Sequence, residues 1–342
     1  MPPSPFLLQR THLTAPATVP RYVDSAVLRS DADLVMLDLE DSIPRGDDAL
    51  LVAGRHGVVR ALCDLDWGAK LRFFRPRGAA LDPGHTDIVD VVSRAGERVQ
   101  GLIYPKVESA NEVRAVDATL AAVERKCGLP VGHVRIGVLI ESVLAEERAF
   151  EIAAASKRIV SLIFGAFDYF RALGVVDAPS RCDHPLIDGA RARIVRAAAS
   201  VGVQAIAEMT VNFPTRDKSP EAQAAALGEC RRDAERAKSL GFRGKWAGIP
   251  SQVAIINSAF ALSQRAIDDA VTAARAFMEA ERLGRGAAMI DGKMTDRATD
   301  RVQRVVLETA FALGRLSQDI AHELGIGGGG SSEGEGLRSL DR

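Results

Sequence analysis

Residues 134–168, VRIGVLIESVLAEERAFEIAAASKRIVSLIFGAFD, decide how this chain is predicted to fold. Two runs, VRIGVLIES (134–142) and RIVSLIFGAFD (158–168), are apolar at nearly every position. That pattern is expected of parallel strands that are covered on both faces. Each run stops at an acid, Glu141 in the first and Asp168 in the second. The stretch therefore predicts a β-α-β unit in which each strand presents one carboxylate.

Similar runs recur along the chain, with helical stretches between them. The further candidate strands cover residues 6–13, 32–41, 70–76, 101–108, 203–209 and 244–251. Helices are predicted over 109–128, which ends in a glycine, and over 219–241, which opens with Ser219 and Pro220. Eight such units predict a (β/α)8 barrel. A doubly wound sheet is the alternative, but no Gly-rich turn follows the first strand.

The strand pattern stops near residue 263. Helices are predicted over 266–284 and 301–325, on either side of a short irregular insert at 285–296. We therefore divide the chain into a catalytic barrel, a C-terminal helical extension that packs on a neighbouring subunit, and a disordered Gly/Ser-rich tail. These three parts cover residues 1–263, 264–324 and 325–342.

The composition excludes several classes of function. Lysine and arginine total 44 against 45 aspartates and glutamates, so no strong field favours nucleic acid or a membrane surface. No apolar run approaches the roughly 20 residues of a membrane span. The four cysteines are far apart and form no CxxC pair, which disfavours a zinc site or a disulfide framework. We expect a cytoplasmic protein.

The chemistry of a barrel enzyme lies at the C-terminal ends of its strands. The polar residues predicted there include Glu40, Asp41, Arg72, Lys106, Glu141 and Asp168. No GxSxG, HExxH or P-loop motif occurs, and Lys106 leaves a Schiff-base aldolase open. A carboxylate pair with an arginine instead suits Mg²⁺ above a carbonyl substrate.

The same residues also have purely structural interpretations. Glu141 and Asp168 can cap the helices that follow them, as can Glu40 and Asp41. Arg72 can form an ordinary salt bridge, and Lys106 can pair with a barrel acid.

Five segments together resemble the citrate lyase β-subunit-like family, the group of malyl-CoA and citramalyl-CoA lyases in the HpcH/HpaI aldolase superfamily. They are LVMLDLEDSI (34–43), LIYPKVES (102–109), residues 137–168, LGFRGKWAGIPSQVAIINSAF (240–260) and DGKMTD (291–296). The resemblance spans roughly residues 8–315 and implies a (β/α)8 barrel, usually trimeric or hexameric, that uses Mg²⁺ and an acyl-CoA. For this chain the resemblance therefore implies a homotrimer or homohexamer that uses Mg²⁺, with Mn²⁺ as the alternative ion. Its small-molecule partners would be an acyl-CoA and an α-keto acid.

The resemblance also implies roles for individual residues. Glu141 and Asp168 correspond to metal ligands, and Arg72 to the arginine that holds the α-keto acid. Glu40 and Asp41 match an acidic pair near the site. Asp296 matches an aspartate that reaches the active site of a neighbouring subunit as an acid–base group, which would explain the insert at 285–296.

The chain departs from the family pattern at four motifs, the first being the opening LFVPG, which reads HLTAPA at 12–17. RVN reads RFF at 72–74, HPSQ has Ile249 in place of the histidine, and AIDG has Ala207 in place of the aspartate. The resulting hypothesis is an Mg²⁺-dependent lyase that cleaves or forms a short β-hydroxyacyl-CoA such as malyl-CoA or citramalyl-CoA. The alternatives are a CoA-independent class II-type aldolase that uses a free keto acid and an aldehyde, and a non-catalytic binding barrel.

Overall fold

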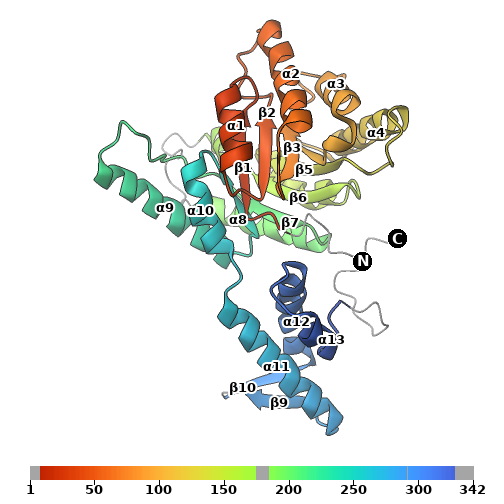
Figure 1. The fold of residues 1–342 in the computed structure, drawn as a ribbon, viewed down its shortest axis with the longest axis vertical. Coiled ribbons are helices and arrows are strands. Elements are labelled where there is room, and N and C mark those ends of the chain that lie inside the picture. The colour runs from red at the N-terminus through yellow and green to blue at the C-terminus, as the bar shows by residue number, and fades with distance from the viewer. Residues whose placement is uncertain (1–7, 175–184, 291, 328–342) are drawn as a thin grey trace. The chain divides into compact units, whose positions relative to one another are not determined.

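The computed structural model describes residues 8–174, 185–290 and 292–327. Eight parallel strands pair in chain order and close into a barrel, because β8 pairs back onto β1 (Figure 1). This confirms the predicted (β/α)8 fold. The strands are β1 (Thr11–Pro16), β2 (Leu34–Asp38), β3 (Leu71–Arg75), β4 (Gly101–Tyr104), β5 (Arg135–Ile140), β6 (Ile159–Phe164), β7 (Gln204–Ala207) and β8 (Gly244–Ala247).

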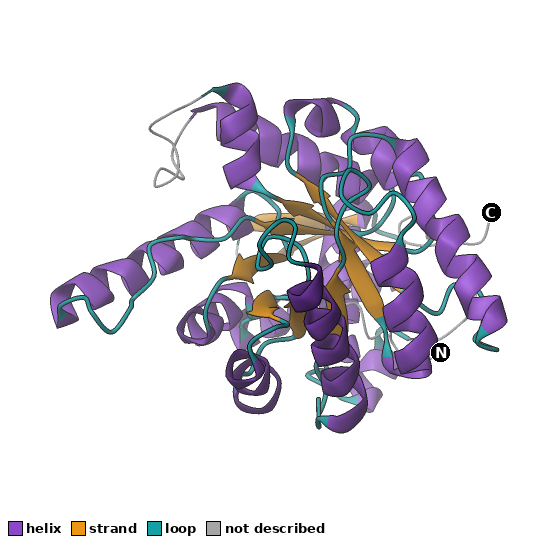
Figure 2. Cartoon of the chain, turned by 90° about the horizontal axis from the view of Figure 1, so that it is seen from above, coloured by secondary structure: helices purple, strands orange, loops and turns teal. Residues whose placement is uncertain are grey.

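Helices surround the strands, as Figure 2 shows. They are α1 (Pro20–Arg29), α2 (Asp48–Asp64), α3 (Thr86–Ala95), the short η2 (Gly96–Arg98), α4 (Ala110–Lys126), α5 (Val143–Glu147), α6 (Ala149–Ala153), α7 (Ala166–Leu173), α8 (Pro185–Ser200), α9 (Pro220–Ser239) and α10 (Pro250–Phe260). The predicted cap at Ser219 is present, because its hydroxyl accepts a hydrogen bond from the backbone N–H of Ala222 at 3.2 Å. The range 6–13 predicted for the first strand overlaps β1 only at 11–13.

Side chains of the strands alternate between two packed layers. One set, which includes Phe74, Leu102 and Val138, packs beneath the helices. The other set fills the interior of the barrel. It includes His12, whose pKa is lowered by burial to about 3, so that this imidazole is neutral at physiological pH.

Residues 261–327 belong to a second compact unit with its own core. It contains α11 (Gln264–Arg282), the antiparallel pair β9 (Ala287–Ile290) and β10 (Lys293–Asp296), α12 (Arg297–Ala312) and α13 (Gln318–Glu323). C-terminal helices are thus present as predicted, but two details of that prediction were wrong. The insert at 285–296 is a β-hairpin, and the helix expected over 301–325 is broken at Gly314, which has a positive φ of 65°.

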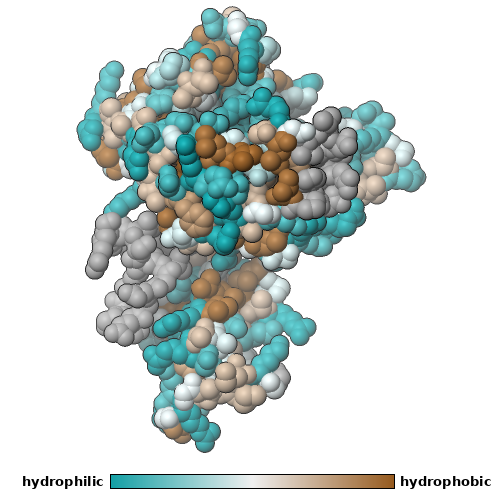
Figure 3. Space-filling model, turned by 180° about the vertical axis from the view of Figure 1, so that it is seen from behind, coloured by the Kyte–Doolittle hydropathy of each residue, from teal (hydrophilic) through white to brown (hydrophobic). Residues whose placement is uncertain are grey.

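Large hydrophobic side chains remain exposed on the barrel, among them Leu144, Phe150, Phe167 and Leu186. Figure 3 shows hydrophobic groups among hydrophilic ones on one face of the molecule. The predicted packing of the helical extension on a neighbouring subunit stays a prediction. In the described part of the chain, no helix is long and apolar enough to span a bilayer. Residues 328–342 of the predicted disordered tail lie outside the described residues.

Candidate active site

The acids predicted from the strand ends gather at one rim of the barrel. They are Glu40 and Asp41 after β2, Glu141 directly after β5, and Asp168 in the first turn of α7. Because the strands are parallel, their C-terminal ends share this rim. Glu40 and Glu141 are 5% and 6% exposed, whereas the side chain of Asp168 is 29% exposed. Two of the acids are therefore almost dehydrated.

Glu141 is held in place by backbone groups on both sides. Its Oε1 accepts a hydrogen bond from the backbone N–H of Lys106 at 2.8 Å. The backbone N–H of Gly165 donates to the carbonyl of Ile140 at 2.9 Å, which draws the ends of β5 and β6 together. A Cβ atom at Gly165 would lie 2.9 Å from Oε2 of Glu141. Only glycine therefore leaves room for the carboxylate here.

The negative charges of the rim act on one another. Burial, together with the neighbouring charges of Glu40 and Asp168, raises the pKa of Glu141 to about 8. Burial also raises the pKa of Glu40, against the opposing charge of Arg75. Glu141 and Asp168 are thus close enough to interact, and the rim favours an additional positive charge.

Arg75, the last residue of β3, is the arginine of this cluster. Its Nε donates to Asp38 Oδ1 at 2.6 Å, and its Nη1 lies 3.1 Å from Glu40 Oε2 and 3.5 Å from Asp41 Oδ2. These carboxylates keep the guanidinium charged, and the pKa of Arg75 is raised despite burial. The guanidinium carbon also lies 5.5 Å from the ring centroid of Trp246.

Arg72 does not reach the cluster. It lies near the start of β3, where its backbone N–H donates to the side chain of Gln100 at 2.9 Å. Its pKa is lowered by burial and then by the charge of Arg98, which precedes β4 at the opposite end of the barrel. Phe74 packs in the layer beneath the helices. The predicted role of Arg72 therefore does not agree with its position.

Lys106 connects two parts of the cluster. Its ammonium donates to Oε1 of Glu40 and, at 3.2 Å, to Oδ1 of Asp41. These contacts raise the pKa of Lys106 despite partial burial. A Schiff-base nucleophile needs a neutral amine, which this environment disfavours. The structure therefore supports the ion-pair interpretation of Lys106.

Two other acids have structural partners. Glu208, which follows β7, is buried and forms an ion pair with Arg191 of α8. Asp296 belongs to the C-terminal unit, where it caps α12 by accepting the backbone N–H of Thr299 at 2.9 Å. Hydrogen bonds from Thr299 lower the pKa of Asp296.

The rim fits an oxygen-loving divalent cation. Five carboxyl groups lie among three cations here: Asp38, Glu40, Asp41, Glu141 and Asp168 among Arg75, Lys106 and the exposed Arg171, which pairs with Asp168 at 3.2 Å. Buried Oε2 of Glu40 completes no hydrogen bond. Among the described residues, no three His, Cys, Asp or Glu side chains could hold a metal by themselves. Mg²⁺ commonly takes one or two carboxylates and completes its shell with water and substrate, so the arrangement suits that ion.

Comparison with known proteins places this geometry in context. Residues 10–250 match the family described as HpcH/HpaI aldolase/citrate lyase. The L-malyl-CoA/β-methylmalyl-CoA lyase of Cereibacter sphaeroides is 32% identical over 323 residues, which cover 90% of this chain and 96% of that protein. The citrate lyase subunit β of Haemophilus influenzae is 30% identical over 307 residues, covering 89% of this chain and 97% of the subunit.

Solved structures share the fold. A citrate lyase from Burkholderia xenovorans superposes with a TM-score of 0.74 at 23% identity, covering 92% of this chain and 95% of that one. The CitE protein of Mycobacterium tuberculosis, solved with magnesium, acetoacetate and coenzyme A, has a TM-score of 0.65 at 23% identity. That comparison covers 90% of this chain and 99% of CitE.

Proposed function

Because the chain belongs to the HpcH/HpaI aldolase/citrate lyase family and is a carbon–carbon lyase, we propose that its substrate is a short β-hydroxyacyl-CoA. Cleavage yields an α-keto acid and an acyl-CoA, and condensation reverses it. The relatives named malyl-CoA lyase support a thioester substrate. The observation that carries the proposal is the convergence of Glu141 and Asp168 on one rim beside the buried Arg75.

We propose that Glu141 and Asp168 hold a Mg²⁺ ion, as the magnesium complex of CitE also suggests. When bound, this ion polarises the carbonyl of the keto acid. Oε1 of Glu141 is already engaged by the N–H of Lys106, so its Oε2 is the oxygen that remains for a cation. Asp168, at the start of α7, is the more accessible of the two acids.

Arg75 takes the role that the sequence assigned to Arg72. Its Nε and Nη1 face Asp38, Glu40 and Asp41, and its Nε donates a hydrogen bond to Asp38. Nη2 is the group that we assign to the carboxylate of the keto acid. Glu40 pairs with both Arg75 and Lys106, so we propose that it positions the guanidinium and that Lys106 holds Glu40, neither contacting the substrate.

Proton transfer needs an accessible carboxylate. Asp41 is 57% exposed and borders both Arg75 and Lys106, so we propose that it accepts the proton of the substrate hydroxyl as the carbon–carbon bond breaks. Asp296 remains the proposed acid–base group at the carbon of the thioester enolate, supplied by a neighbouring subunit of a homotrimer or homohexamer. Its lowered pKa favours the carboxylate, which suits the base of the condensation direction.

The test is a mass-spectrometric screen of short acyl-CoA esters with glyoxylate, pyruvate or oxaloacetate, in Mg²⁺, in Mn²⁺ and in excess chelator. We expect a metal-dependent β-hydroxyacyl-CoA with at least one pair. Products from a keto acid and a free aldehyde, without CoA, would instead identify a class II-type aldolase. No turnover, and no change in melting temperature with any keto acid, would favour a binding barrel.

A further inference from the structure

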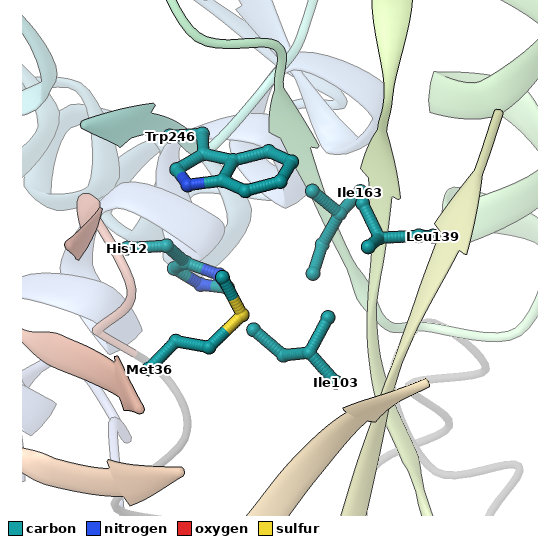
Figure 4. A pocket seen from close by; sticks show the side chains of 6 residues that line it. All are labelled: His12, Met36, Ile103, Leu139, Ile163 and Trp246. Carbon is teal, nitrogen blue, oxygen red and sulfur yellow. The ribbon is translucent and has the colours of Figure 1, made fainter. Parts of the chain in front are cut away.

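The side chain of Trp246 separates the candidate site from the interior of the barrel. It lines the same interior space as His12, Met36, Ile103, Leu139 and Ile163, as Figure 4 shows. Those five residues are at most 1% exposed, whereas Trp246 is only partly buried. The space among the six side chains has no room for a water molecule. Trp246 therefore covers the packed interior of the barrel and forms the floor of the candidate site above it.

The indole is fixed from two directions. Its Nε1–H donates a hydrogen bond to Oγ1 of Thr14, on the adjacent strand β1. The guanidinium carbon of Arg75 lies 5.5 Å from the ring centroid, within the range of a cation–π contact. A ring held in this way cannot rotate aside without losing both contacts.

The ring adds a contact to the ion pairs that hold Arg75. Its carboxylate partners, Asp38, Glu40 and Asp41, all attract the guanidinium with the same sign of charge. The face of the indole supplies a further contact that involves no ion pair and remains when the carboxylates bind other cations. Loss of such a contact typically lowers the equilibrium constant between the held and the displaced cation by about 2- to 30-fold.

We propose that Trp246 is a positioning and specificity-determining residue of the lyase reaction: its ring helps to hold Arg75 in place and forms the floor that the substituent of the keto acid meets. The inference rests on the proposed function, because it takes Arg75 to bind the keto acid. Because the guanidinium of Arg75 lies 5.5 Å from the ring centroid, a keto acid whose carboxylate binds Arg75 would place its substituent close to the indole. The packed layer beneath the ring offers no deeper space.

The experiment compares Trp246→Leu, Trp246→Phe and Thr14→Val, using glyoxylate, pyruvate and 2-oxobutyrate with the best acyl-CoA of the wild type. Trp246→Leu removes the aromatic face and opens the floor. We expect its KM for pyruvate to rise about tenfold, and its kcat/KM ratio of 2-oxobutyrate to pyruvate also to rise about tenfold. Trp246→Phe keeps an aromatic ring, so its KM for pyruvate is expected to change less than threefold. Thr14→Val keeps the indole but removes the acceptor of its hydrogen bond. Its KM for pyruvate should lie between those of the two Trp246 variants.

An unchanged ratio in Trp246→Leu would overturn the specificity role. Equal KM values in the Leu and Phe variants would overturn the positioning role, since a residue that only fills space would not distinguish an aromatic ring from an aliphatic chain.

A second measurement does not depend on turnover. The chain has two tryptophans, and the other, Trp67, is buried and donates to the carbonyl of Ala61 in α2. In a Trp67→Phe protein, the emission of Trp246 should change on titration with pyruvate in Mg²⁺. Constant emission throughout the titration would contradict the inference. An emission change in a protein without lyase activity would keep only the contact between Trp246 and the keto acid, and would reject the proposed reaction.

Discussion

Nε of Arg75 donates to Oδ1 of Asp38 over 2.6 Å, and the two residues are register partners that end the adjacent strands β3 and β2. Both are almost fully buried. Arg75, and not Arg72, therefore faces the rim, because side chains three positions apart on a strand point to opposite faces.

We predict that Arg75→Lys lowers kcat/KM by about 10²–10³, since an ammonium cannot replace a planar fork that contacts several acids at once. The matched control is Arg72→Lys, on the same strand but at its other end, which should change kcat/KM less than threefold. Steady-state kinetics on the substrate found by the screen measure both. A comparable loss in the two variants would contradict the assignment.

Glu141→Gln should abolish metal-dependent turnover and the rise in melting temperature caused by Mg²⁺, because a neutral amide is a poor ligand for a hard cation. Glu147→Gln is the control, since Glu147 is 62% exposed and pairs with Arg193 in α8. Thermal denaturation with and without Mg²⁺ gives the readout. Persistence of the full Mg²⁺ shift in Glu141→Gln would remove this residue from the metal site.

The raised pKa of Glu141 predicts a pH effect in the metal-free protein. Between about pH 4.5 and about pH 8, the folded protein retains a proton that the unfolded chain has lost. The free energy of unfolding should therefore fall as the pH rises through this window, by at most about 1.4 kcal/mol per pH unit.

Binding of Mg²⁺ inside that window should release the proton. Titration calorimetry in two buffers of different ionisation enthalpy counts the protons released, and Glu141→Gln removes the effect. Identical heats in both buffers for the wild type would count against the raised pKa.

Gly165→Ala should displace the Glu141 carboxylate, because the added methyl group would lie 2.9 Å from Oε2. We expect a destabilisation of about 1–3 kcal/mol and weaker Mg²⁺ binding. Gly189→Ala in α8 is the control, since an added Cβ there meets nothing within 4 Å. Alanine at that helical site should stabilise by up to about 1 kcal/mol. Chemical denaturation separates the two, and equal effects would contradict the steric argument.

Asp296 has a capping role in the structure and a proposed catalytic one, and two substitutions separate them. Asp296→Asn preserves a good cap, whereas Asp296→Ala removes it at about 1 kcal/mol. If Asp296 also transfers a proton, both variants lose activity although Asp296→Asn keeps its stability. Wild-type activity in Asp296→Asn would leave the cap as its role.

The sequence was informative where apolar runs and acids coincide. Apolar runs that stop at a carboxylate predict both the barrel strands and the acids at their ends, which are Glu40, Asp41, Glu141 and Asp168. The choice of arginine failed because it relied on aligning a short motif. Counting alternation back from the strand end would have favoured Arg75, since Phe73 points into the barrel and against Gly101.

Other features leave weaker traces in sequence. The contact between Arg75 and Trp246 joins β3 to β8, and no local pattern reports such a pairing. The apolar spacing predicted one continuous helix, but the helix ends near Gly314, which has a positive φ. The spacing of apolar residues carries no information about φ.

Lys106 has a positive φ of 52°, a conformation that suits glycine better than lysine, yet both its backbone N–H and its ammonium serve the rim. The backbone conformation at this position therefore favours glycine, whereas the ion pairs with Glu40 and Asp41 require lysine. A glycine there would relieve the backbone but leave the buried carboxylate of Glu40 with one cation fewer. Engineering of this loop therefore has to keep the side chain and the unusual backbone of Lys106 together.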